Sequence, residues 1–125
     1  MKKLISTNKA PAALGPYSQA IEANGLVFLS GMLPIDCTTG NFVPGGIKEQ
    51  TAQIFINIKA VLSAADLNID KVIKTTVYLN DISLFDEMNE IYKTQFKEPY
   101  PARSTIAVKC LPKNSLVEIE VIAAK

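Results

Sequence analysis

Only two stretches of this chain carry the apolar spacing of a helix, and most of the remainder is patterned as strands and turns. One face of the first predicted helix consists of Ile47, Ile54, Ile58, Val61 and Ala65. The second has an apolar face made by Leu84, Phe85, Met88, Ile91, Tyr92 and Phe96. Two helices are enough to cover one face of a sheet but not both. We therefore expect the second face to be solvated or covered by another subunit.

The N-terminal third is predicted to form short strands. Alternating apolar residues and turn residues indicate strands at 3–7, 18–23 and 26–30. The Asn24-Gly25 pair between the last two strands is typical of a tight hairpin turn. Residues 31–46 carry Gly, Pro and Asn and are expected to form a connecting loop. The strand at 26–29 is apolar on both faces, which again favours a sheet buried on two sides.

The rest of the chain alternates strands with the two helices. A strand at 72–80 separates them, and a Ser83–Asp86 capping box is expected to open the second helix, which ends at the proline break 99–101. Two last strands are expected at 102–109 and 116–123. This order predicts an α+β fold whose mixed β-sheet contains at least one strand–helix–strand crossover. No repeat or change of composition divides the chain, so we expect a single domain over residues 1–125.

The charge balance argues against two classes of partner. Thirteen basic and twelve acidic residues leave a formal charge of +1, which gives little attraction to nucleic acid or to an anionic membrane. No stretch approaches the roughly 20 apolar residues that span a bilayer, and no long apolar segment follows the N-terminal lysines. We expect a soluble cytoplasmic protein with no membrane partner.

The chain contains no histidine, which restricts any chemistry. Its absence removes the usual base at neutral pH, the commonest zinc ligand and every catalytic triad built on histidine. Cys37 and Cys110 lie outside any metal-ligand spacing and are expected to be free thiols. An enzyme of this composition must work with carboxylate, guanidinium, hydroxyl and backbone groups.

The last two predicted strands carry ionisable residues opposite their apolar faces. In the strand at 102–109 the apolar face is Ser104, Ile106 and Val108, which leaves Arg103 on the other side. In the strand at 116–123, Glu118 likewise alternates with apolar residues. We expect Arg103 and Glu118 to share the face that the helices leave uncovered. They are either a structural ion pair or an anion site, in which Arg103 grips a carboxylate and Glu118 orients a water molecule.

Four further residues are weaker candidates. Asn89 lies on the apolar side of the second helix, where its amide either caps a loop or contacts a ligand. Ser30 and Gly31 end an apolar strand, where a glycine permits close approach of backbone to a ligand but equally suits an ordinary turn. For Tyr17 the simpler interpretation is a buried ring with a satisfied hydroxyl.

Five segments, in order and in register, closely resemble the Rid family, formerly called YjgF, and its RidA branch. They are APAALGPYSQA at 10–20, FLSGMLP at 28–34, KTTVYL at 74–79, PARST at 101–105, and LPK at 111–113 leading into VEIEV at 117–121. The resemblance implies a chorismate-mutase-like fold. It also implies a homotrimer, in which three sheets form a central β-barrel with the helices outside and a ligand cleft at each interface.

The resemblance also assigns roles to residues. It implies that Arg103 binds the carboxylate of a 2-imino acid and that Glu118 positions the hydrolytic water. Tyr17, Ser30, Gly31, Asn89 and the backbone N–H of Thr105 fall on cleft positions of the family. Neither a metal nor an organic cofactor is implied. Many relatives have cysteine at the position of Thr105, but a backbone contact survives that exchange.

The activity implied is hydrolytic deamination of 2-iminopropanoate and 2-iminobutanoate to 2-keto acids and ammonia, with short uncharged side chains expected on the substrate. Two other functions stay open. One is a regulatory trimer that binds keto acids without turning them over. The other is action on RNA, as a translation inhibitor or endoribonuclease, against which the neutral charge and the absence of histidine argue.

Overall fold

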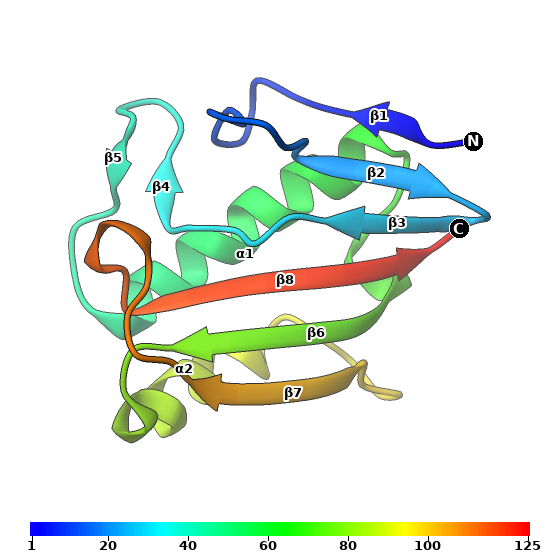
Figure 1. Ribbon diagram of the computed structural model, residues 1–125. Coiled ribbons are helices and arrows are strands. Elements are labelled where there is room, and N and C mark those ends of the chain that lie inside the picture. The colour runs from blue at the N-terminus through cyan, green and yellow to red at the C-terminus, as the bar shows by residue number, and fades with distance from the viewer.

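A computed structural model of residues 1–125 shows one six-stranded mixed sheet with both helices on the same side of it (Figure 1). The strand order is β1-β2-β3-β8-β6-β7. These strands are β1 Lys3–Ile5, β2 Ala20–Ala23, β3 Leu26–Leu29, β6 Val72–Leu79, β7 Ala102–Ala107 and β8 Val117–Ala124. All neighbours are antiparallel except β6 and β7, which are parallel. The predicted α+β fold with a strand–helix–strand crossover is therefore confirmed.

The two helices, α1 Ile47–Ala64 and α2 Phe85–Tyr92, lie behind the sheet in Figure 1. The apolar face predicted for the first helix is buried at every position: Ile47, Ile54, Ile58, Val61 and Ala65. The rings of Phe55, Tyr92 and Phe96 pack edge-on or tilted, with centroids 4.9 to 5.8 Å apart, and join the helices to the chain that follows α2. The core thus lies between the sheet and one helix layer. Neither helix has the combination of length and hydropathy that a membrane span requires.

Local predictions were confirmed at one turn and wrong at three places, one of which is the end of the second helix: α2 ends at Tyr92 and not at the proline break 99–101. Asn24 and Gly25 both have positive φ, as the tight turn between β2 and β3 requires. The predicted loop at 31–46 contains a small hairpin of β4 Ile35–Asp36 and β5 Asn41–Phe42. The capping box at Ser83 is absent, because the Asp81 carboxylate accepts the Ser83 N–H at 2.8 Å and starts a short 3₁₀ turn, Ile82–Leu84, before α2.

The face of the sheet that turns away from the helices carries an apolar row. The register aligns Leu4 with Ile21, Ile21 with Phe28, and Phe28 with Ile122, across β1, β2, β3 and β8. Leu4 is 61% exposed and Phe28 is 42% exposed, whereas Val27 on the same strand is fully buried in the core. These four residues are called the open-face row below. In a single chain they remain without a covering layer.

Candidate functional site

Arg103 is held against α2 at the edge of the sheet. Its strand, β7, is the last strand in the order of the sheet, and the register aligns Arg103 with Thr75 of β6. The hydroxyl of Thr75 is hydrogen-bonded to that of Tyr92 at 2.8 Å under the helices. The guanidinium carbon lies 4.5 Å from the centroid of the Tyr92 ring and 5.4 Å from that of Phe85. The Arg103 Nη1 donates a 2.7 Å hydrogen bond to the Asn89 Oδ1. An aromatic and amide cradle therefore fixes the guanidinium.

The side chain of Arg103 is exposed and forms no ion pair with an acidic residue of the chain. The two ion pairs of the chain join Lys48 to Glu90 and Lys125 to Glu22. The fork of a guanidinium carries five N–H donors, and here one nitrogen is engaged by a neutral amide. The remaining donors are free to bind an anion, and a carboxylate fits them in the bidentate geometry. The structural ion pair with Glu118 considered from the sequence is not formed within the chain.

The prediction that Arg103 and Glu118 share the uncovered face was wrong. Thr75 is fully buried beneath the helices, so its register partner Arg103 points to the helix side as well. The face of Ser104 and Ile106, interpreted from the sequence as the buried side, is the open one, and Ile106 is 48% exposed. The reason is the edge position of β7, because a strand with few neighbours buries neither face completely and its apolar pattern does not indicate the core side.

Glu118 points to the open face of the sheet from β8. Its neighbours Val117 and Ile119 are fully buried on the helix side, and the register aligns Glu118 with Tyr78 of β6. Burial raises the pKa of the Glu118 carboxyl above its usual value, and the negative charge of Glu120 raises it further. A carboxyl with a raised pKa is better suited to exchanging protons near neutral pH.

Gly31 makes room for this carboxyl. A Cβ atom added at Gly31 would collide with the carboxyl group of Glu118, so the carboxyl fills the space that any larger residue at position 31 would need. Gly31 does not adopt a left-handed backbone, and its role here is steric. The sequence suggested close approach to a ligand at this glycine, whereas the structure shows close approach of a carboxyl side chain. The hydroxyl of Tyr78 donates a 2.7 Å hydrogen bond to Glu120 on the same face.

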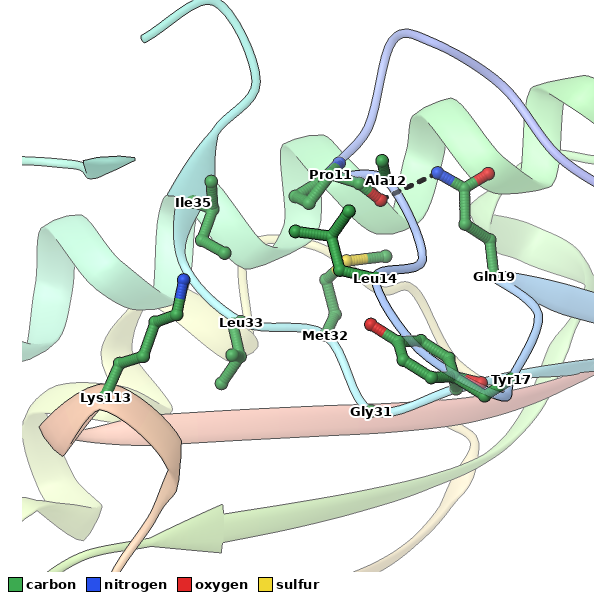
Figure 2. A pocket seen from close by; sticks show the side chains of 11 residues that line it. Pro11, Ala12, Leu14, Tyr17, Gln19, Gly31, Met32, Leu33, Ile35 and Lys113 are labelled. Carbon is green, nitrogen blue, oxygen red and sulfur yellow. Dashed lines mark hydrogen bonds between the residues drawn. The ribbon is translucent and has the colours of Figure 1, made fainter. Parts of the chain in front are cut away.

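Tyr17, Ser30 and Gly31 line one cavity of about 180 Å³, called the Gly31 pocket (Figure 2). The interpretation of Tyr17 as a buried packing residue was wrong, since it is 53% exposed and contributes to the wall of this pocket. The Ser30 hydroxyl donates to the Ser18 carbonyl at 2.6 Å and ties the start of the pocket to the preceding loop.

Gln19 is a site residue that the sequence analysis missed. It lines the Gly31 pocket, is 6% exposed, and its amide donates to the carbonyls of Thr7 and Pro11 at 3.0 and 2.7 Å. It also accepts the Thr7 N–H at 2.7 Å. These bonds hold the N-terminal loop over the pocket. The only signal was an amide beside an apolar strand, which does not reveal partners several residues upstream.

Thr105 lies on the same side of β7 as Arg103. Its register partner Val77 is fully buried on the helix side, and the Thr105 hydroxyl oxygen is buried without a hydrogen-bond partner. A buried polar atom of this kind is normally satisfied by a ligand, a water or another chain. An unsatisfied polar atom therefore lies on the same side of β7 as Arg103.

The predicted residues fall into two groups rather than one. The arginine group consists of Asn89, Arg103 and Thr105, on the helix side of β7 and its edge. The glutamate group consists of Tyr17, Ser30, Gly31 and Glu118, on the open side around β8. Because β6 separates the two strands, which places them roughly 10 Å apart, a ligand of a few carbon atoms cannot contact both groups in one chain.

Comparison with known proteins covers nearly the whole chain. The family model described as Endoribonuclease L-PSP matches residues 7–125. The 2-iminobutanoate/2-iminopropanoate deaminase of Mus musculus is 46% identical over 125 residues, which is 100% of this chain and 93% of the mouse protein.

Solved structures show the same fold. A protein of the conserved Rid protein family from Yersinia pestis, YyfA, is 48% identical and superposes with a TM-score of 0.97 over 100% of both chains. E. coli TdcF, solved with bound serine, is 40% identical, with a TM-score of 0.92 over 98% of each chain. TdcF itself thus binds a small amino acid.

Proposed function

The chain belongs to the Rid family, whose family model is described as Endoribonuclease L-PSP, and we propose that it hydrolyses small 2-imino acids to 2-keto acids and ammonia. The observation that carries the proposal is a pair of complementary groups. One is the Arg103 guanidinium, which has no acidic partner, and the other is the half-buried Glu118 carboxyl with a raised pKa. A 2-imino acid needs both, because it has a carboxylate beside an electrophilic carbon.

The proposed active unit is a homotrimer of chorismate-mutase-like fold with a central β-barrel. Three features support it: the open-face row, which is apolar and lacks a covering layer, the edge strand β7, and the separation of the two groups within one chain. Packing the open faces of three copies together buries the row. In the proposed assembly the exposed β7 edge of one subunit, which carries the arginine group, lies against the glutamate group of the next subunit, so that each interface holds one complete site.

Arg103 orients the substrate in this scheme. Its free N–H donors bind the carboxylate in two parallel hydrogen bonds, and the bond to Asn89 keeps the guanidinium from rotating. The Thr105 hydroxyl lies on the same side as Arg103 without a hydrogen-bond partner, and we propose the Thr105 backbone N–H as a further donor to the substrate. A substrate fixed at its carboxylate presents C2 to the opposite subunit, where Glu118 lies. This orientation lowers the entropic part of the barrier.

Glu118 moves the protons of the reaction. A water oxygen attacks C2 of the 2-iminium group and its proton passes to the Glu118 carboxylate, while the C=N electron pair goes to nitrogen. Glu118 then returns the proton to that nitrogen, and the C–N bond breaks to release ammonia as the C=O bond forms. The hydroxyl proton passes to the Glu118 carboxylate and from there to the ammonia, which leaves as ammonium. The products are a 2-keto acid and ammonium, and no redox step occurs. The raised pKa of Glu118 suits both the basic and the acidic half of this cycle.

The proposed substrates are 2-iminopropanoate and 2-iminobutanoate, the compounds in the name of the mouse relative. A pyridoxal-phosphate-dependent dehydratase acting on serine or threonine generates these imines in the test. Semicarbazide traps the free imine, so a deaminase lowers the rate of semicarbazone formation in proportion to its concentration. The proposal fails if micromolar protein leaves that rate unchanged.

The same purified protein also serves to distinguish imine hydrolysis from the two other functions, keto-acid binding and action on RNA. A keto-acid-binding regulator would bind 2-oxobutanoate without lowering semicarbazone formation. An RNA-directed protein would cleave or bind RNA in a salt-dependent manner, which the formal charge of +1 argues against. Incubation with a labelled RNA at physiological salt, under the conditions of the imine assay, tests this directly.

A further inference from the structure

Three members of the glutamate group, Tyr17, Ser30 and Gly31, line the Gly31 pocket, and the rest of its wall is mainly apolar. In Figure 2 the side chains between Tyr17 and Lys113 are aliphatic or thioether groups: Leu14, Met32 and Leu33. The volume of about 180 Å³ exceeds the roughly 150 Å³ of a cavity that accommodates benzene. The pocket therefore has room for a substrate side chain longer than the methyl or ethyl group of the smallest 2-imino acids.

Lys113 is the only charged residue that lines this pocket. The same lysine lines a neighbouring cavity, which shares Pro11 and Leu14 with the Gly31 pocket and again has no acidic residue in its wall. Lys113 takes part in neither ion pair of the chain. An apolar pocket that ends at an uncompensated ammonium group matches a ligand with an aliphatic chain and an anionic end.

The backbone around Lys113 fixes its position. Lys113 and Asn114 both have left-handed φ angles, 54° and 58°, which non-glycine residues rarely adopt in succession. The loop is anchored to α1, because the buried Gln50 side chain accepts the Leu116 N–H at 2.9 Å. Outlying backbone angles that surrounding contacts maintain cluster at ligand sites. Here they direct a lysine to the far wall of the pocket.

We infer that the Gly31 pocket takes the side chain of a dicarboxylic 2-imino acid, whose distal carboxylate binds the Lys113 ammonium group. This inference rests on the proposed function, since the imine carbon must lie beside Glu118, whose carboxyl group is next to Gly31, a lining residue of the pocket, but does not itself line it. The methylene groups pack on the apolar wall. The chemistry at C2 stays the same, so only the choice of substrate changes.

The test compares two imines of equal side-chain length. Glutamate and norvaline each carry three side-chain carbons, and an L-amino-acid oxidase with catalase converts both to 2-imino acids that semicarbazide traps. We expect a higher kcat/KM for the glutamate imine. Lys113→Gln should lower that value about fivefold, as expected for a single ion pair near the surface, and leave the norvaline imine unchanged. Lys59→Gln removes an exposed lysine of α1 and should change neither value.

A binding measurement keeps this inference separate from the proposed activity. Calorimetry with 2-oxoglutarate and 2-oxopentanoate reports the pocket whether or not imines are hydrolysed. Tighter binding of 2-oxoglutarate that is lost in Lys113→Gln supports the assignment, even if no imine is turned over. Equal affinities in the wild-type protein, or a preference that survives Lys113→Gln, overturn the assignment, even if 2-iminopropanoate is hydrolysed efficiently.

Discussion

The carboxyl group of Glu118 occupies the space that a Cβ atom at Gly31 would need. Gly31→Ala should therefore displace the carboxyl group. Because the colliding atoms are the far end of a flexible side chain and the backbone of Gly31 is not left-handed, the cost in folding stability should be small. Imine hydrolysis should fall roughly a hundredfold, since a misplaced group loses much of its effect.

Thermal unfolding and the semicarbazide assay together check this expectation. The double variant Gly31→Ala with Glu118→Gln is the control. If the glycine acts only by making room for the carboxyl, the double variant should be no slower than Glu118→Gln alone. Full activity in Gly31→Ala would contradict the placement of Glu118 in the reaction.

Arg103 should be the residue most sensitive to substitution in substrate binding. If Arg103 binds the substrate carboxylate as proposed, Arg103→Ala should remove a charge-assisted bidentate contact of about 3 kcal/mol, which corresponds to a loss of roughly a hundredfold in kcat/KM. Lysine should restore only part of it, because a point charge does not reproduce the fork. Asn89→Ala should raise KM more than it lowers kcat, since the guanidinium keeps its charge and loses one positioning bond. An Arg103→Ala trimer with undiminished kcat/KM would return this residue to a structural role.

The pH dependence of hydrolysis should reflect the two neighbouring glutamates. Burial and the Glu120 charge raise the pKa of Glu118, so the ionised form that accepts a proton from water is lost as the pH falls through this raised value. Glu120→Gln removes the like charge and keeps the hydrogen-bonding shape toward Tyr78. The acid limb of kcat/KM should therefore move to lower pH in this variant. A limb that stays in place, or moves upward, would show that Glu120 does not act on Glu118 in this way.

The sequence predicted well which elements form the layers of the fold, and poorly on which face of the sheet each site residue lies. The apolar faces of α1 and β8 and the Asn24-Gly25 turn follow from local spacing, and all three were confirmed. The side of Arg103 depends on how the edge strand β7 is aligned with β6, which local spacing does not reveal. The contact between Gly31 and Glu118 joins residues far apart in the chain. The family resemblance found both residues, but only the register shows where they lie.

Subunit mixing tests the interfacial site most directly, because Arg103 and Glu118 lie on opposite faces of one sheet. Arg103→Ala and Glu118→Gln should each be nearly inactive alone. In trimers assembled at random from equal amounts of the two variants, about a quarter of the interfaces should combine an intact Arg103 with an intact Glu118 from different subunits. Refolding the mixture should therefore restore about a quarter of the wild-type rate, whereas a site within one chain would gain nothing. Light scattering at three chain masses serves as the control, and a second mixture in which one variant also carries Phe28→Glu in the open-face row should form fewer trimers and recover less activity.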